Sequence, residues 1–168
     1  MAGIKSIDDL FLHTLKDIYY AERQILKALP KMAKAAQSEE LRESFLLHRD
    51  QTQGQIERLQ QVFEALGKRA QGVTCEAING LIEECEELLE EAPQPSAVRD
   101  AGLVASAQAV EHYEMARYGA LLAWAKASGK KDVLALIEAN LQEEKETDTL
   151  LNKMANATIN QQAVKQAA

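Results

Sequence analysis

Acidic and other polar residues interrupt the apolar stripes of four long segments with helical periodicity. They fall near the middle of each stripe: Glu22 in the first segment, His48, Thr52 and Gln55 in the second, Glu111 and Glu114 in the third, Glu144 and Asp148 in the fourth. Carboxylates combined with an imidazole suit iron or manganese. For any single residue, a partly exposed position at the edge of a core explains the pattern equally well, so the metal hypothesis depends on the whole set.

The polar residues fall at matching heights when helices joined by short loops are aligned at their turns. Glu22 lies about 14 residues before its turn, and about 14 residues after that turn the chain reaches Thr52 and Gln55, with an uncertainty of about 3 Å at the helical rise. Glu114 lies about 13 residues before the next such turn, and the same count forward reaches Glu144. The polar residues are therefore predicted to meet at mid-height in the core.

Several carboxylates at one buried level need compensation, because unpaired buried charges are costly and like charges repel. Protonation, a Lys or Arg partner, or a bound cation could each supply it. The stripes contain no Lys or Arg, which favours iron or manganese, as one ion or two. The predicted metal site is assigned to Glu22, Glu111, Glu114 and Glu144 as ligands, with His48, Gln55 and Asp148 as ligands or neighbours of ligands. For His48, the role of an ordinary core histidine stays open.

Five helices are predicted to position these residues. Their ranges are 7–37, 38–66, 74–91, 96–128 and 132–155, with Ser38 as a cap and Gly67 as a stop. Pro30 predicts either a kink or a helix held by tertiary packing. The short helix predicted at 74–91 is long enough to return the chain along the bundle. The helices predicted at 38–66 and 96–128 are therefore expected to run parallel. We predict one all-α domain over residues 1–168, a four-helix bundle with one crossover and a frayed tail at 156–168.

Composition excludes several classes of function. The net charge of −7, without a basic run, argues against nucleic acid as a partner. The chain has no apolar run that could span a membrane and no apolar secretory core near its start. Cys75 and Cys85 are too far apart for a Cys-x-x-Cys motif and are interpreted as reduced core residues of a cytoplasmic protein. Motifs of hydrolases and nucleotide-binding proteins are absent, so no catalytic residue is assigned.

The stretches DIYYAERQILKALPKMAKAA, HRDQTQGQIERLQQVF, VEHYEMARYGALLAWAKASG and LQEEKETDTLL resemble the YciE/YciF family of bacterial stress-associated, ferritin-like proteins. The resemblance implies a bundle similar to rubrerythrin and other di-iron carboxylate proteins, often paired as a homodimer. It marks seven positions: Glu22, His48, Thr52, Gln55, Glu111, Glu114 and Glu144. The sequence departs from relatives at Gln51, where they tend to carry a carboxylate, and it lacks the Glu-x-x-His motif of well-known di-iron sites.

Two functions follow from these observations. The first is a stress-associated protein that binds a non-haem metal through core carboxylates and carries out oxidase-type or peroxidase-type chemistry. The alternative is a structural or partner-binding stress protein that kept the bundle and lost redox activity. The carboxylates in the stripes favour the first function, whereas Gln51 and the missing Glu-x-x-His motif favour the alternative.

Overall fold

The computed structural model describes residues 3–92 and 94–166. Over these residues the chain folds into the helices α1 (Ile7–Ala35), α2 (Glu39–Ala65), α3 (Glu76–Glu91), α4 (Ala97–Ala127), α5 (Leu134–Met154) and α6 (Asn160–Gln166). A 3-10 turn at Lys131–Val133 precedes α5, and a π-helical segment at Ala155–Ile159 joins α5 to α6. The predicted all-helical fold class is confirmed.

Local sequence signals set the ends of the long helices. The Oγ atoms of Ser6, Ser38 and Ser96 accept hydrogen bonds from backbone N–H groups in the first turns of α1, α2 and α4. Gly67 and Gly129 follow α2 and α4 with φ values of 64° and 71°. Because this left-handed conformation favours glycine, both positions stop their helices sharply.

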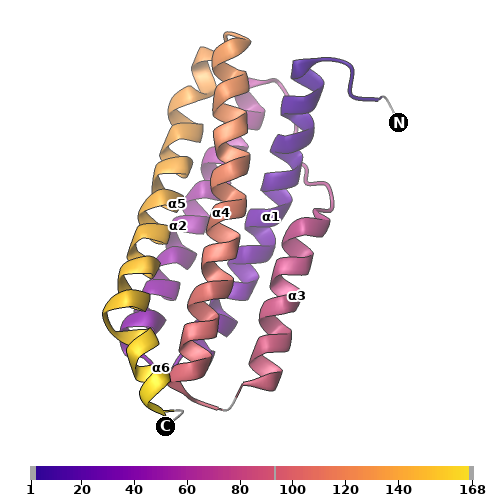
Figure 1. The fold of residues 1–168 in the computed structure, drawn as a ribbon. Helices are drawn as coiled ribbons and strands as arrows, with labels where there is room; N and C mark the ends of the chain where they lie inside the picture. The colour runs from indigo at the N-terminus through magenta and orange to yellow at the C-terminus, as the bar shows by residue number, and fades with distance from the viewer. Residues whose placement is uncertain (1–2, 93, 167–168) are drawn as a thin grey trace.

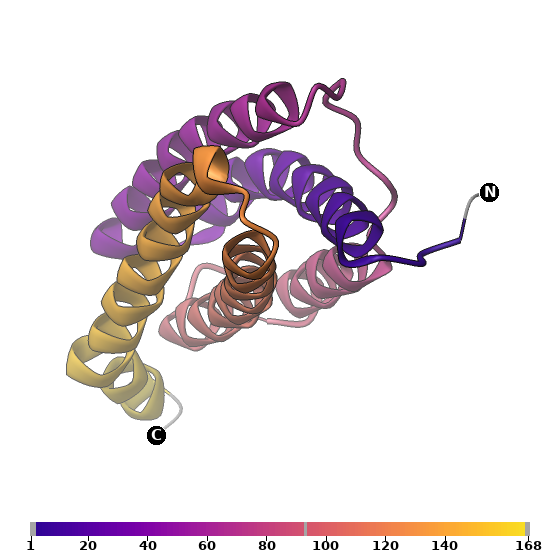
Figure 2. The same cartoon turned by 90° about the horizontal axis from the view of Figure 1, so that it is seen from above.

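Helices α1, α2, α4 and α5 lie lengthwise beside one another, and α3 covers α1 and α4 from outside (Figures 1 and 2). The Asp100 carboxylate of α4 accepts hydrogen bonds of 2.8 Å from the backbone N–H groups of both Gln37 and Ser38. The beginnings of α2 and α4 therefore lie at one end of the bundle. Lys130 pairs with Asp8 at the opposite end, where α1 begins and α4 turns into α5.

The helix boundaries differ from the predicted ones by a few residues. Helix α1 ends at Ala35 and continues through Pro30. Pro30 itself is exposed, whereas Leu29 and Met32 beside it are buried, which agrees with a helix held by tertiary packing. Helix α3 begins at Glu76 rather than Thr74, because the Cys75 thiol caps it by accepting a hydrogen bond from the Ile78 N–H.

The expectation that the tail is frayed is wrong for residues 156–166, which are helical. Ile159 is only 2 % exposed and packs into the core. The Gln166 side chain accepts a hydrogen bond of 2.7 Å from the backbone N–H of Ala97. One apolar anchor and one capping contact thus hold the segment against the start of α4. Residues 167–168 lie outside the described part of the chain.

The core is apolar towards both ends and polar near its middle. Large side chains such as Phe11, Phe45 and Phe63 are at most 1 % exposed, and Cys75 and Cys85 are buried free thiols, as predicted. Among the described helices, none combines the length and apolar character needed to cross a bilayer. The polar middle of the core is the candidate functional site.

Candidate metal centre

Three helices bring one histidine and three glutamates together in the core. His48 comes from α2, Glu111 and Glu114 come from α4, and Glu144 comes from α5. All four are buried, and each offers one possible ligand atom within 4.8 Å of the others. Glu111 and Glu114 are three residues apart, which places both carboxylates on the same face of α4. These four residues therefore converge from directions that allow one cation to contact all of them.

His48 lies between two of the carboxylates. Its Nδ1 atom is 3.2 Å from Glu111 Oε1, and its Nε2 atom is 3.7 Å from Glu144 Oε2. Thr52 Oγ1 donates a 2.9 Å hydrogen bond to the backbone carbonyl of His48, one turn earlier in α2. The imidazole thus lies at ion-pair distance from two carboxylates contributed by different helices.

The carboxylates of this cluster have few other partners. Within the described residues, both side-chain oxygens of Glu111, Glu114 and Glu144 are buried without a hydrogen bond. Buried polar atoms in folded proteins nearly always have a partner, so six such oxygens in one place require an explanation. Oxygen and imidazole nitrogen atoms that converge in this way fit a divalent metal ion.

The electrostatics of the site favour the neutral form of Glu22, Glu111 and Glu114 when no cation is present. Burial raises the pKa of Glu22, Glu111 and Glu114 well above the ordinary glutamate value, and the negative charge of nearby Glu144 raises each pKa further. A bound cation reverses this preference, because a metal ligand must be deprotonated. A cation bound here would therefore displace protons from these glutamates.

Glu22 of α1 belongs to the same buried level but has a partner of its own. The hydroxyl of Tyr118 donates a hydrogen bond to Glu22 Oε1, while Glu22 Oε2 is without a hydrogen bond among the described residues. The hydrogen bond from Tyr118 lowers the pKa of Glu22, against the larger effect of burial. Glu22 and Glu114 lie close enough that each affects the pKa of the other.

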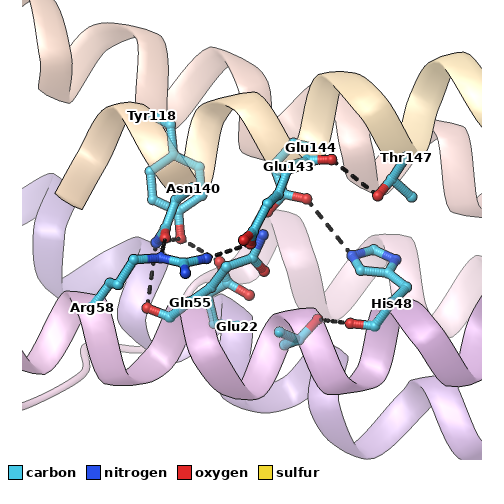
Figure 3. A network of polar contacts seen from close by, with 10 residues as sticks. Glu22, His48, Gln55, Arg58, Tyr118, Asn140, Glu143, Glu144 and Thr147 are labelled. Atoms are coloured by element: carbon cyan, nitrogen blue, oxygen red, sulfur yellow. Dashed lines mark hydrogen bonds and ion pairs between the residues drawn. The ribbon is translucent and has the colours of Figure 1, made fainter. Parts of the chain in front are cut away.

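A chain of hydrogen bonds connects Glu22 with the side of the bundle (Figure 3). Asn140 Nδ2 donates bonds of 3.0 Å to the Tyr118 hydroxyl and 3.3 Å to the backbone carbonyl of Gln55. The Arg58 side chain, which is half-buried on α2, donates a hydrogen bond to Asn140 Oδ1. These contacts fix the orientation of the Tyr118 hydroxyl, and through it that of Glu22.

Arg58 also pairs with Glu143, the neighbour of Glu144 on α5. Arg58 lowers the pKa of Glu143, although burial, the larger effect, raises it. The positive charge of Arg58 is thus already shared with a carboxylate outside the cluster.

The structure places the predicted residues Glu22, His48, Glu111, Glu114 and Glu144 at one level of the core. Gln55 is fully buried two turns beyond His48, and its amide nitrogen and oxygen make no hydrogen bond with the described residues. Gln55 lies beside Glu143, whose pKa it lowers against the larger effect of burial, and is not one of the four clustered residues.

Asp148 lies outside the cluster. It is half-buried and accepts bonds from His112 Nε2 at 3.1 Å and from Gln108 Nε2 at 3.3 Å. The reason is the rotation of α5: Thr147, three residues after Glu144, faces the core and is 6 % exposed, whereas Asp148 faces the side of α4. His112 itself has an exposed side chain, so its contact with Asp148 lies at the surface of the bundle.

Two residues of the site, Asn140 and Arg58, were not predicted from the sequence. Asn140 is 1 % exposed and lies one turn before Glu144, so its spacing on α5 was a usable signal. Arg58 lies three residues after Gln55, on the flank of the stripe rather than in it, where a long side chain can still reach inward.

The fold and the cluster define a class of protein: a helical bundle with carboxylates and a histidine converging in its core. The chain belongs to the family described as "Domain of unknown function (DUF892)", whose model matches residues 6–164. Protein YciF of Escherichia coli (strain K12) is 42 % identical over 166 residues, which cover 98 % of this chain and 99 % of that protein. The resemblance to the YciE/YciF family is thereby confirmed.

Solved structures agree with this assignment. The crystal structure of the Escherichia coli stress protein YciF matches with a TM-score of 0.88 at 42 % identity, covering 94 % of this chain and 99 % of that chain. The structure of YcfI from Rhodopseudomonas palustris, described only as a candidate structural protein, matches with a TM-score of 0.87 at 52 % identity over 89 % and 94 % of the two chains. A protein from Xanthomonas campestris shares the fold at 21 % identity, with a TM-score of 0.74 over 97 % and 100 % of the two chains.

Proposed function

We propose that this protein is a stress-associated, ferritin-like protein that binds non-haem iron or manganese in its core. One observation carries the proposal: His48, Glu111, Glu114 and Glu144 converge within 4.8 Å, and the carboxylate oxygens have no hydrogen-bond partner in the described part of the chain. These four residues would hold the first ion. Glu22, with one free oxygen at the same level, is the additional ligand for a second ion, and Gln55 lies beside them.

The one-crossover, ferritin-like arrangement is part of this proposal. Its support is that Asp100 joins the beginnings of α2 and α4, while α3 passes back along the outside of the bundle. In ferritin-like bundles, metal sites form from glutamates and histidines that project inward from facing helices. The cluster in this chain draws on α2, α4 and α5 in the same manner, with Glu22 of α1 beside it.

The chemistry follows from the kind of ion. Oxygen and nitrogen ligands suit Fe(II) and Mn(II), and a bound Fe(II) ion would supply redox chemistry towards dioxygen or a peroxide. The residues of the chain would hold the ion and exclude water, and the protons that the cation displaces from Glu111 and Glu114 would leave to the solvent. This is the proposed oxidase-type or peroxidase-type activity.

Thermal unfolding of metal-free protein with and without metal tests the binding. Fe(II) without oxygen, and separately Mn(II), should raise the melting temperature, because a ligand at about 100 times its Kd stabilises the native state by about 2.7 kcal/mol. The rise should persist in Glu138→Gln, an exposed carboxylate of α5 that serves as control, and disappear in Glu144→Gln. An unchanged melting temperature with metal, together with greater stability of the Glu22→Ala/Glu144→Ala variant, would show that the site holds no ion.

A structural or partner-binding role is the second candidate. Two observations favour it: YcfI, at 52 % identity, is described as a candidate structural protein, and the Glu-x-x-His motif is absent. Oxygen uptake after addition of Fe(II) separates the candidates. Faster uptake by the wild-type chain than by Glu111→Gln supports redox chemistry, whereas equal uptake despite bound iron supports the structural role.

A further inference from the structure

A small apolar cavity lies beneath α3, where this helix covers α1 and α4. Its volume is about 40 Å³. Ile25 and Leu29 of α1, Ile82 and Leu89 of α3, and Ala107 and Val110 of α4 line it. A water molecule needs roughly 10–15 Å³ by the same measure, so the cavity has room for a molecule of a few atoms.

The two ends of the cavity have different neighbours. At the inner end lie His48 and Glu111, two members of the proposed metal centre. At the outer end lie Lys31 and Glu86, which form an ion pair of 3.0 Å with side chains that are 70 % and 53 % exposed. The cavity thus borders an exposed ion pair between α1 and α3 as well as two buried residues of the proposed metal centre.

The lining selects what can occupy the cavity. Apolar side chains cannot replace the hydration of an ion, and a cavity with an apolar lining stays dry but accepts small apolar molecules. A separate groove between α2 and α5 also reaches His48. Ser44, Gln51 and Glu146 line that groove with polar atoms.

We propose that the cavity beneath α3 is a binding site and passage for dioxygen on its way to the metal centre. Dioxygen is small and apolar enough for the cavity, whereas hydrogen peroxide is polar and would lose its hydrogen bonds with water there. The inference rests on the proposed function and deepens it, because it selects dioxygen over peroxide as the oxidant. It also assigns the crossover helix α3 a role, since α3 forms one wall of the passage.

Methyl-group NMR of the metal-free, full-length chain under dissolved dioxygen tests this directly, because dioxygen is paramagnetic and broadens the signals of nearby groups. Methyl signals of Ile25 and Leu29, which line the cavity and are 3 % exposed, should broaden strongly. Signals of Leu59 and Leu121, which are 0 % exposed and lie elsewhere in the core, should not.

Variants that fill the cavity complete the test. Ala107→Leu places a larger side chain in the cavity. If this variant does not fold, Ala28→Leu fills the cavity from a half-buried position. Either variant should lose the selective broadening, whereas Ala116→Leu on the exposed side of α4 should keep it.

The outcomes separate this inference from the proposed function. Equal broadening of lining and control methyls, or broadening that persists in the filled variants, overturns the passage even if the chain binds metal. Selective broadening that the filled variants lose supports the passage. If such a chain binds no Fe(II), the gas site stands and the proposed metal function fails.

Discussion

A buried carboxylate avoids an isolated negative charge either by holding a proton or by facing a cation. Glu111 and Glu114 have neither a hydrogen-bond partner among the described residues nor a basic side chain other than His48 in their cluster. Glu22 differs from them, because the hydrogen bond from Tyr118 favours its charged form. At the residue scale, therefore, the cluster is a set of proton-binding groups that a metal ion, as proposed, would convert into ligands.

The stability of the metal-free chain should fall as pH rises. Burial and Glu144 raise the folded-state pKa of Glu22, Glu111 and Glu114 above the unfolded-state value. The resulting stability is fully present below the ordinary glutamate pKa and is lost as pH rises through the raised values. Each unit of upward shift contributes about 1.4 kcal/mol. Urea unfolding in the presence of chelator, at a series of pH values from about 5 to 8, measures this loss.

A matched pair of variants isolates the core carboxylates from the general negative charge of the chain. Glu111→Gln/Glu114→Gln removes two titrating groups from the core and should flatten the pH dependence. Glu83→Gln/Glu84→Gln removes the same number of carboxyl groups from the exposed face of α3 and should leave the pH dependence of stability steep. Identical slopes for the two variants would contradict the assignment of raised pKa values to the core.

At the scale of the helices, the sequence predicted what periodicity and caps determine. The apolar stripes with a spacing of three and four residues identified the long helices, and the cap at Ser38 and the stop at Gly67 were placed correctly. Which of two neighbouring side chains on a helix faces the core was harder to predict. Thr147 and Asp148 fit the stripe of α5 equally well, and only packing against α4 decides that Thr147 faces inward.

The C-terminal segment and Asn140 were missed for a related reason. Ile159 is a single buried residue in a polar stretch, so periodicity gives little signal although its packing holds the segment. The spacing of Asn140, one turn before Glu144, indicates that it faces the core, but its role becomes recognisable only once the hydroxyl of Tyr118 is placed next to it. Contacts between distant helices, rather than local pattern, determine both.

Two glycine variants test how the loop before α3 is attached to α1. A Cβ atom at Gly72 would lie 3.0 Å from Tyr20 Cβ and 3.3 Å from Tyr20 Cα, whereas a Cβ atom at Gly80 in α3 would meet nothing within 4 Å. Gly72→Ala should therefore lower the free energy of unfolding by about 1 kcal/mol through overpacking. Gly80→Ala should raise it by about 0.5–1 kcal/mol through helix propensity. Changes of the same sign in urea unfolding would show that the loop does not pack closely on α1.

At the scale of the whole molecule, the surface suggests how copies could pair. Leu47 of α2 and Leu150 of α5 are 55 % and 37 % exposed, and both line the groove between these helices. Exposed apolar residues that lie together are typical of interaction sites. We predict a homodimer in sedimentation equilibrium at micromolar concentration. Leu47→Glu should dissociate it, whereas Val164→Glu, at an apolar position on α6 that is 73 % exposed, should not. A wild-type species of only 18.6 kDa would contradict the dimer.

The number of metal ions retained per chain tests the central claim most directly. Protein reconstituted with Fe(II) without oxygen and then freed of unbound metal should hold about one or two ions per chain, as carboxylate bundle sites do. The control Glu138→Gln should hold the same amount, and Glu111→Gln/Glu144→Gln should hold almost none while keeping its helical circular dichroism. A wild-type chain without bound iron, or a double variant with as much iron as the wild type, would contradict a metal centre at His48, Glu111, Glu114 and Glu144.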